Sequence, residues 1–246
     1  MKAVIVIPAR LKSTRLPEKM LVDLDGKPLV VRTYEQAKKS RLASDVLLAV
    51  DSKRLLDIAE SFGCKAVLTP ENLQSGTDRI AFAAKSIDAD VVINVQGDEP
   101  LIPPEMIDSA ILPFIENAAL PCATLIQPIV SDVPEILQNP NVVKVVTDKN
   151  GYALYFSRSP IPYQRNSDAQ PKIFRHIGLY AFRKPALETF TTLPPSMLEE
   201  TERLEQLRLL ENGIRIKCVI TNLDSQAVDT ADDLAKVKAI LAKKLK

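Results

Sequence analysis

Residues 3–7 read Ala-Val-Ile-Val-Ile, and the basic loop PARLKSTRLPEK follows them directly at residues 8–19. A short, continuous run of mainly β-branched residues is typical of a strand buried on both faces of a parallel sheet. Similar runs recur at residues 46–50, 65–68 and 91–95, and helical patterns lie between them at residues 29–39, 54–62 and 78–87. This alternation predicts an α/β fold with a doubly wound, mostly parallel sheet.

The second half of the sequence is less regular. We predict strands at residues 142–147, 152–157 and 176–182, and helices at residues 201–212 and 232–244, with Gly213 ending the first of these helices. The prolines of residues 159–171 oppose both helix and central strand, so we expect an exposed arm or loop over the site. No linker interrupts the 246 residues. The chain is therefore predicted to be one domain, residues 1–246, with residues 130–220 as an irregular elaboration within it.

Composition excludes several classes of partner. The 32 Lys and Arg residues nearly balance 31 Asp and Glu residues, which argues against nucleic acid or an anionic membrane as a partner. The apolar runs are too short to cross a bilayer or to form a signal segment, so we expect a cytoplasmic protein. Three widely spaced cysteines in apolar segments, Cys64, Cys122 and Cys218, indicate buried thiols rather than a disulfide framework or a zinc site.

The loop at residues 8–19 carries the first candidate site. Arg10, Lys12, Arg15 and Lys19 repel one another unless an anion compensates them, and guanidinium forks with ammonium groups match polyphosphate oxygens. The glycines of a Walker loop are absent, so side chains would supply the contacts to a triphosphate. The alternative interpretation is a solvated basic loop.

A second candidate site is the segment NVQGDEP, residues 94–100, where a buried strand ends in an acid flanked by glycine. The carboxyl ends of parallel strands meet in one crevice, so Asp98 is expected to face the basic loop and to hold Mg²⁺ on substrate phosphates. Gln96 offers a neutral amide beside it. The alternative is an acid in an ordinary turn.

Two further segments precede predicted helices. Ser75 and Gly76 lie where free backbone N–H groups favour anions or carbonyl oxygens, although a simple helix cap explains them equally well. Asp229 stands before the last helix and is a candidate second Mg²⁺ ligand. Its spacing alone favours a helix cap formed by Asp229 or Thr230.

Taken together, the segments IPARLKSTRLPEK, QSGTDR, NVQGDEP, NVVKVV with YALYFSR, RHIGLYAF, LEQLR and VDTADDL resemble the 3-deoxy-manno-octulosonate (Kdo) cytidylyltransferases. The first and third segments are shared more loosely with other sugar nucleotidyltransferases, including CMP-sialate synthetases, whereas RHIGLYAF and LEQLR look particular to the Kdo branch. The resemblance implies a Rossmann-like nucleotidyltransferase that converts CTP and Kdo into CMP-Kdo and pyrophosphate for lipopolysaccharide synthesis.

The resemblance also implies roles for individual residues. Those near the nucleotide would be Ala9, Arg10, Arg15, Lys19, Ser75, Gly76, Gln96 and Asp98. Catalysis would depend on Arg10, Lys19, Asp98 and Asp229. Mg²⁺ would bind Asp98 and Asp229, which reverses the preference for Asp229 as a cap.

The sugar side of the resemblance maps onto Arg158, His176, Tyr180, Glu205 and Gln206. A sugar carboxylate suits an Arg fork or amide donors, and sugar hydroxyls suit groups that also accept. His176 is the only histidine; a lone histidine is usually structural, but the matching motif favours sugar binding here. Glu205 and Gln206 would diverge by about 100° on a helix, so we expect one to bind sugar and the other to support it.

Other functions remain compatible with these motifs. An enzyme acting on 8-amino-Kdo would keep nearly all of them, and a CMP-sialate synthetase would share the phosphate loop. A nucleotide-binding regulatory protein would keep the basic residues but has no need for both acids. The resemblance further implies a homodimer, for which the irregular second half could supply the interface.

Overall fold

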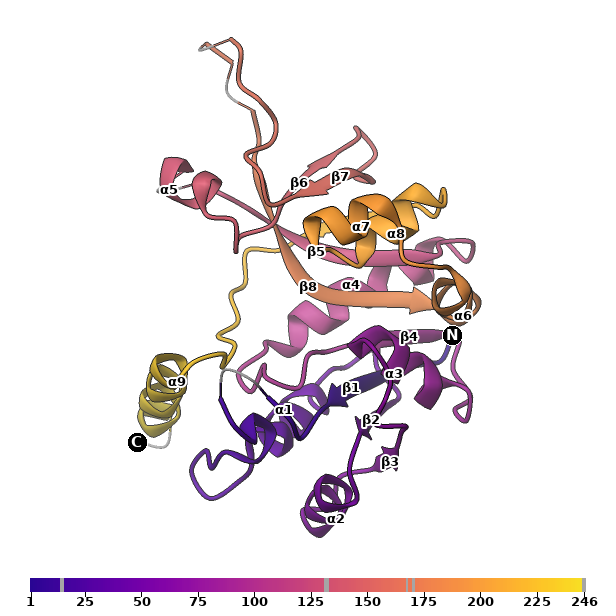
Figure 1. The fold of residues 1–246 in the computed structure, drawn as a ribbon, viewed down its shortest axis with the longest axis vertical. Helices are drawn as coiled ribbons and strands as arrows, with labels where there is room; N and C mark the ends of the chain where they lie inside the picture. Colours follow the sequence, from indigo (N-terminus) through magenta and orange to yellow (C-terminus); the bar gives the residue numbers. More distant parts are fainter. Residues whose placement is uncertain (14–15, 131–132, 167, 170, 245–246) are drawn as a thin grey trace.

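The computed structural model of the protein describes residues 1–13, 16–130, 133–166, 168–169 and 171–244. Its centre is a mixed sheet with the strand order β3-β2-β1-β4-β8-β5-β9, and β6 pairs with β7 and β8 (Figure 1). The strands β3, β2, β1 and β4 run parallel to one another, whereas β8 runs antiparallel to both β4 and β5. The predicted α/β class is confirmed, with one antiparallel strand in the middle of the sheet.

The strands of the parallel part are short; β1 and β4 are fully buried, β2 is mostly buried, and the edge strand β3 is partly exposed. They are β1 (Ala3–Ala9), β2 (Asp45–Val50), β3 (Ala66–Leu68) and β4 (Val91–Asn94). The remaining strands are β5 (Cys122–Pro128), β6 (Lys144–Thr147), β7 (Ala153–Ser157), β8 (Phe174–Arg183) and β9 (Ile216–Ile220).

Helices connect these strands. In the first half they are the 3-10 helix η1 (Lys19–Leu21), α1 (Leu29–Ala37), α2 (Lys53–Ser61), α3 (Gly76–Ala84) and α4 (Pro104–Glu116). In the second half they are α5 (Val133–Gln138), α6 (Lys184–Thr192), α7 (Met197–Glu202), α8 (Gln206–Glu211) and α9 (Ala231–Lys244).

The sheet separates two hydrophobic cores, as the alternation of side chains along β1 requires. Ile5 and Ile7 pack in one core with residues of α1, α2, α4 and α9. Val4 and Val6 face the other core, which includes residues of α3, α6 and α8. The alternate side chains of this apolar run therefore face the two cores, as predicted for a strand buried on both faces.

Several details of the second half differ from the prediction. The helix predicted over residues 201–212 is two short helices, because Arg203 adopts a left-handed conformation (φ 54°, ψ 49°) between α7 and α8. Gly213, with φ 73°, does follow α8 as predicted. The helix α4 and the strands β5 and β9 were not predicted; Pro113 lies inside α4, and a proline there opposes a helical assignment.

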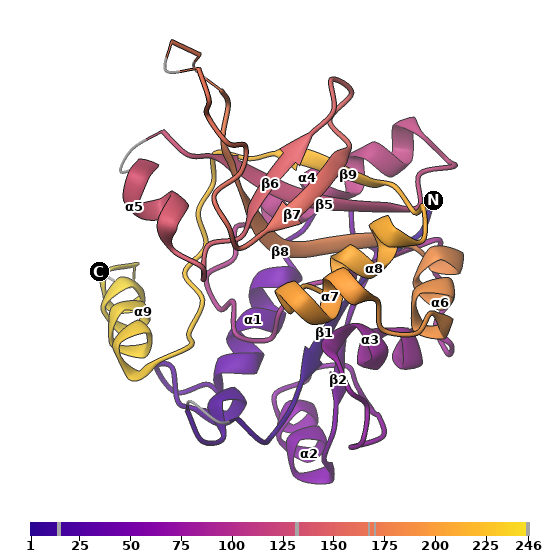
Figure 2. The same cartoon turned by 45° about the horizontal axis from the view of Figure 1, so that its top comes forward.

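The described residues of the proline-rich arm, 159–166, 168–169 and 171, are mostly exposed, as predicted, and project away from the body of the molecule (Figure 2). None of these described residues lines the cavity described below, so the expectation that the arm covers the site is not met by them in this conformation. The three cysteines are buried free thiols, in agreement with the sequence.

Residues 221–230 lead from β9 to α9 and bring the end of the chain back to the parallel strands (Figures 1 and 2). Within this segment, Val228 N donates a hydrogen bond of 2.9 Å to Asp98 O, beyond the end of β4. Val228 is fully buried, and Val237 of α9 joins the core on the α1 side of the sheet. This return places Asp229 next to Asp98.

Gly97 allows β1 and the segment after β4 to lie close together. A Cβ atom on Gly97 would stand 2.9 Å from Pro8 O and 3.0 Å from Met20 Sδ. The first of these is a backbone atom, which cannot move aside as a flexible side chain can. The glycine therefore keeps the basic loop and the Gln-Gly-Asp turn in one crevice.

Gly97→Ala is expected to lower the free energy of unfolding by about 1–3 kcal/mol, because the added methyl group overpacks a backbone contact. Thermal or denaturant unfolding measures this change. Gly178→Ala is the matched control, since no atom lies within 4 Å of its added Cβ. Equal stability of both variants would show that the close approach imposes no constraint.

Candidate active site

Lys19 joins two carboxylates that are far apart in the sequence. Its Nζ atom lies 2.7 Å from Asp98 Oδ2 and 3.0 Å from Asp229 Oδ1. Lys19 is 8% exposed, and its surroundings raise its pKa: burial lowers the value, but the charges and hydrogen bonds of Asp98 and Asp229 outweigh burial. Both predicted acids therefore face one point.

Asp229 and Thr230 have separate tasks. Thr230 and Asp233 cap α9 reciprocally: Asp233 N donates to Thr230 Oγ1 at 3.2 Å, and Thr230 N donates to Asp233 Oδ2 at 3.0 Å. Asp229 directs its carboxylate to Lys19 instead. Of the two residues predicted as alternative caps, Thr230 caps α9 and Asp229 pairs with Lys19.

Two residues that the sequence analysis missed hold this acidic pair in place. The carboxylate of Glu99 accepts a hydrogen bond from the Ser225 hydroxyl, which ties the segment before Asp229 to the end of β4. Burial raises the pKa of Glu99 to about 6; Ser225 opposes this shift, and the nearby charges of Asp98 and Asp229 add to it. The position of Glu99 directly after Asp98 in the sequence could have identified it as a residue of this site.

The basic loop begins at the end of β1. Arg10 Nη2 donates to Leu73 O at 3.1 Å, and Leu11 N donates to Asp51 Oδ1 at 2.9 Å, which anchors the loop to its neighbours. Ala9 is 1% exposed, and its part in nucleotide binding stays a prediction. Arg15 lies outside the described residues.

The second predicted nucleotide segment is a helix cap in this structure. Ser75 and Asp78 form a capping box at the start of α3, with Asp78 N donating to Ser75 Oγ at 3.1 Å. Gly76 stands beside Pro8, whose Cγ would lie 3.5 Å from an added Cβ. The segment therefore adjoins the end of β1, and its part in nucleotide binding stays a prediction.

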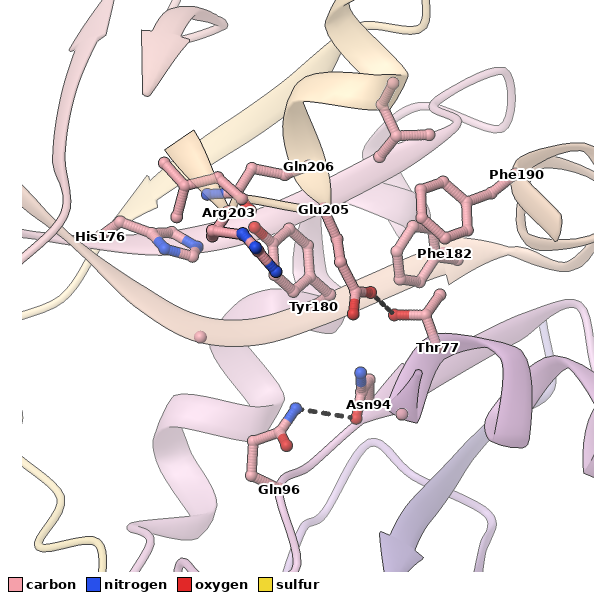
Figure 3. A pocket seen from close by; sticks show the side chains of 14 residues that line it. Thr77, Asn94, Gln96, His176, Tyr180, Phe182, Phe190, Arg203, Glu205 and Gln206 are labelled. Atoms are coloured by element: carbon pink, nitrogen blue, oxygen red, sulfur yellow. Dashed lines mark hydrogen bonds between the residues drawn. The ribbon is translucent and has the colours of Figure 1, made fainter. Parts of the chain in front are cut away.

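A cavity of about 270 Å³ opens beside these elements (Figure 3). Its walls come from the start of α3, the end of β4, β8, α6 and the turn before α8. Its lining residues are Gly76, Thr77, Asn94, Gln96, His176, Gly178, Tyr180, Phe182, Phe190, Arg203, Leu204, Glu205, Gln206 and Leu209. Gln96, two residues before Asp98 in the sequence, lines this cavity after the end of β4.

Polar groups from distant segments meet across this cavity. Thr77 Oγ1 donates to Glu205 Oε2 at 2.8 Å, which joins α3 to the turn before α8 (Figure 3). Burial raises the pKa of Glu205, and the hydrogen bond from Thr77 opposes that shift. Gln206 is 7% exposed, and its Nε2 atom has no hydrogen-bond partner among the described residues.

Glu205 and Gln206 both line the cavity. The prediction assumed a continuous helix over residues 201–212, whereas the left-handed Arg203 ends α7 and Glu205 is the residue before α8. Glu205 nevertheless has helical backbone angles (φ −54°, ψ −35°), so the two side chains still diverge as neighbours on a helix do. The expectation that one binds sugar and the other supports it stays a prediction.

His176 is held as a neutral imidazole. Its Nε2 atom lies 3.0 Å from Thr124 Oγ1, and its ring meets Phe156 edge to face at a centroid distance of 5.1 Å. Burial lowers the pKa of His176 to about 3. Tyr180, whose ring centroid lies 5.3 Å from that of His176, lines the same cavity.

Arg158 does not line the cavity. Its guanidinium donates to three backbone carbonyl oxygens: Nε to Glu202 O at 2.7 Å, Nη1 to Pro140 O at 2.8 Å and Nη2 to Arg203 O at 3.2 Å. The structure thus brings four of the five predicted sugar residues together and places Arg158 behind the α7–α8 turn. It adds Arg203, Thr77 and Asn94, which the sequence analysis did not select.

Comparison with known proteins identifies the family. A family model described as "Cytidylyltransferase" matches residues 4–216. A 3-deoxy-manno-octulosonate cytidylyltransferase from Chlorobaculum tepidum is 55% identical over 241 residues, which cover 98% of this chain and 97% of that protein. The chain belongs to the 3-deoxy-manno-octulosonate cytidylyltransferases. Another member, from Pelodictyon phaeoclathratiforme, is 53% identical over 245 residues, covering 100% of this chain and 99% of the relative.

Solved structures agree with this membership. A CMP:2-keto-3-deoxy-manno-octonic acid synthetase complexed with CTP matches with a TM-score of 0.93 and 42% identity, covering 99% of this chain and 100% of that one. A cytidylyltransferase from Leptospira borgpetersenii matches with a TM-score of 0.66 at 18% identity and shares the fold. The mixed sheet with its β6–β7 hairpin is therefore that of the cytidylyltransferase family.

Two kinds of feature are absent from the described part of the chain. Within it, no set of three or more His, Cys, Asp or Glu side chains gathers as a metal site. None of its helices has the length and apolar character that a bilayer crossing requires. A cation on Asp98 and Asp229 would thus need oxygens from substrate or water to complete its coordination.

The imidazole of His176 is expected to stay neutral from pH 8 down to pH 5. Because it is the only histidine, its ring signals in a nitrogen NMR titration are unambiguous. The unfolded chain binds a proton near pH 6.5, so this residue stabilises the fold above that pH, and the contribution is lost progressively as pH falls below it. A ring that titrates near pH 6.5 in the folded protein would contradict the buried, neutral state.

Proposed function

We propose that this protein joins CTP and Kdo to give CMP-Kdo and pyrophosphate. The observation that carries the proposal is the convergence of Lys19, Asp98 and Asp229 beside a cavity rich in neutral hydrogen-bonding groups. The acidic pair suits a cation-bound triphosphate, and the cavity suits a polyhydroxylated sugar. Family membership supports CTP and Kdo as the two substrates.

The residues of the acidic pair fit Mg²⁺. The side chains of Asp98 and Asp229 are 21% and 39% exposed, so both can reach a cation that also keeps water and phosphate oxygens. Both carboxylates already accept from the ammonium group of Lys19, which supports the proposal that they share a cation. When bound, Mg²⁺ would neutralise phosphate charge and orient the reacting groups.

In the proposed reaction, the anomeric hydroxyl oxygen of Kdo bonds to the α-phosphorus of CTP. The bond from that phosphorus to the bridging oxygen of the β-phosphate breaks, pyrophosphate leaves, and the hydroxyl proton passes to solvent. Arg10 and Lys19 would hold the phosphates and stabilise the charge that grows on the leaving group. No protein nucleophile is needed, so positioning by the protein is the main contribution.

Asp98→Asn and Asp229→Asn are each expected to slow pyrophosphate formation on the order of 100-fold at saturating Mg²⁺, because each removes a charge that would hold the cation. Single-turnover kinetics with CTP and Kdo measures this effect. Asp224→Asn is the control, because Asp224 lies on the same segment as Asp229. The side chain of Asp224 is 71% exposed and pairs with Arg175 of β8. A wild-type rate in either test variant would remove that acid from the mechanism.

The identity of the substrates follows from pyrophosphate release with the four nucleotides against Kdo, 8-amino-Kdo and sialic acid. We expect the highest kcat/KM with CTP and Kdo. A preference for 8-amino-Kdo or sialic acid would reassign the sugar. Tight CTP binding without turnover on any of these sugars would instead support a regulatory protein.

We further propose that the enzyme acts in the cytoplasm, that its product CMP-Kdo is used for lipopolysaccharide synthesis, and that the active form is a homodimer. Support for these statements comes from family resemblance. Sedimentation at enzyme concentrations used in assays would measure the oligomeric state.

A further inference from the structure

The cavity has one fixed positive charge. Of its fourteen lining residues, only Arg203 carries a guanidinium or ammonium group. His176 is neutral, and Glu205 adds a carboxyl group rather than a cation. An acidic ligand in this cavity therefore has a single cationic side chain available along its walls.

The backbone of Arg203 is fixed in a conformation that non-glycine residues seldom adopt. Its φ of 54° and ψ of 49° place it in the left-handed region between α7 and α8. Hydrogen bonds hold the turn from both sides: Arg203 N and Leu204 N both donate to Glu199 O, the latter at 3.2 Å, and Arg158 Nη2 donates to Arg203 O at 3.2 Å. Backbone strain that neighbours maintain in this way is typical of functional sites.

The turn directs the Arg203 side chain into the cavity (Figure 3). Nearby arginines are already occupied: Arg208 makes hydrogen bonds of 2.7 and 2.5 Å to Glu199, and Arg158 binds backbone carbonyls. By contrast, the guanidinium of Arg203 has neither a hydrogen bond nor an ion pair with any residue in the described ranges. It is the arginine of this region that can still bind a ligand.

A second donor stands beside it. Gln206 is 93% buried, lines the same cavity, and has an unpartnered Nε2 atom among the residues described. A buried donor without a partner costs free energy unless a ligand satisfies it. A carboxylate accepts several hydrogen bonds at once, so it could satisfy both the guanidinium and the amide.

We infer that Arg203 binds the carboxylate of the acidic sugar, with Gln206 as a neutral donor beside it. Arg203 thereby determines the preference for an acidic over a neutral sugar. Arg158, for which the sequence predicted direct sugar binding, acts here as a positioning residue, because its guanidinium holds the carbonyl of Arg203. This inference rests on the proposed function, in which the second substrate is a sugar acid.

The test compares Kdo with its carboxamide, which has nearly the same shape but no charge. Dissociation constants for both are measured by calorimetry with the wild-type protein, Arg203→Met and Arg203→Lys. Methionine keeps the length of the aliphatic stem and leaves the backbone carbonyl for Arg158, so the turn is expected to persist. Arg41→Met, which removes an exposed guanidinium outside the cavity, controls for a general change in charge.

The wild type is expected to bind Kdo about 10- to 100-fold more tightly than the carboxamide, as the loss of a charged hydrogen bond implies. Arg203→Met should reduce this ratio to below about threefold, Arg203→Lys should retain part of it, and Arg41→Met should leave it unchanged. The KM for CTP should not change in Arg203→Met. A wild-type ratio in Arg203→Met, or an equal loss of both ligands, would overturn the inference.

Turnover measured in parallel separates this inference from the proposed function. If the wild type releases pyrophosphate from CTP and Kdo but the ratio of the carboxamide and Kdo dissociation constants does not depend on Arg203, the function stands and the inference fails. If Kdo binds through Arg203 without pyrophosphate release, the inference stands and the function fails. If the wild type does not bind Kdo, both fail.

Discussion

The candidate site depends on the contacts of the Lys19 ammonium group with two carboxylates. The ammonium group stands between Asp98 and Asp229, which would otherwise face each other as two partly buried carboxylates. Two carboxylates that face one point repel each other unless a cation lies between them. The surrounding structure serves this arrangement: Gly97 permits the close approach of β1, and Val228 bonds to the backbone of Asp98.

Parallel and antiparallel strands of the one mixed sheet contribute different parts of the candidate site. The parallel strands β1 and β4 end in loops that carry Arg10, Lys19 and Asp98, as the general rule for open α/β sheets requires. The antiparallel strand β8 runs beside β4 and supplies His176 and Tyr180 to the cavity wall. The reversal of strand direction thus places His176 and Tyr180, which are predicted to bind sugar, beside the strand whose following loop carries Asp98.

The turn between α7 and α8 separates two short helices at the wall of the cavity. The left-handed Arg203 ends α7 and itself lines the cavity. Glu205 already has helical backbone angles before α8, so Glu205 and Gln206 line the cavity as neighbours on one helical turn. The hydrogen bond from Arg158 to the carbonyl of Arg203 helps to maintain that turn.

Hydrophobic periodicity and loop chemistry are local properties, so the residue pattern was enough to predict the α/β class, the meeting of the basic loop with Asp98, and the buried thiols. The packed structure was needed to show that Thr230 caps α9 while Asp229 turns to Lys19, and that Arg203 rather than Arg158 lines the cavity. The bonds of Lys19 to Asp229 and of Arg158 to Arg203 join residues 210 and 45 positions apart. The partner in such a bond cannot be read from spacing, since it is selected by how the layers pack.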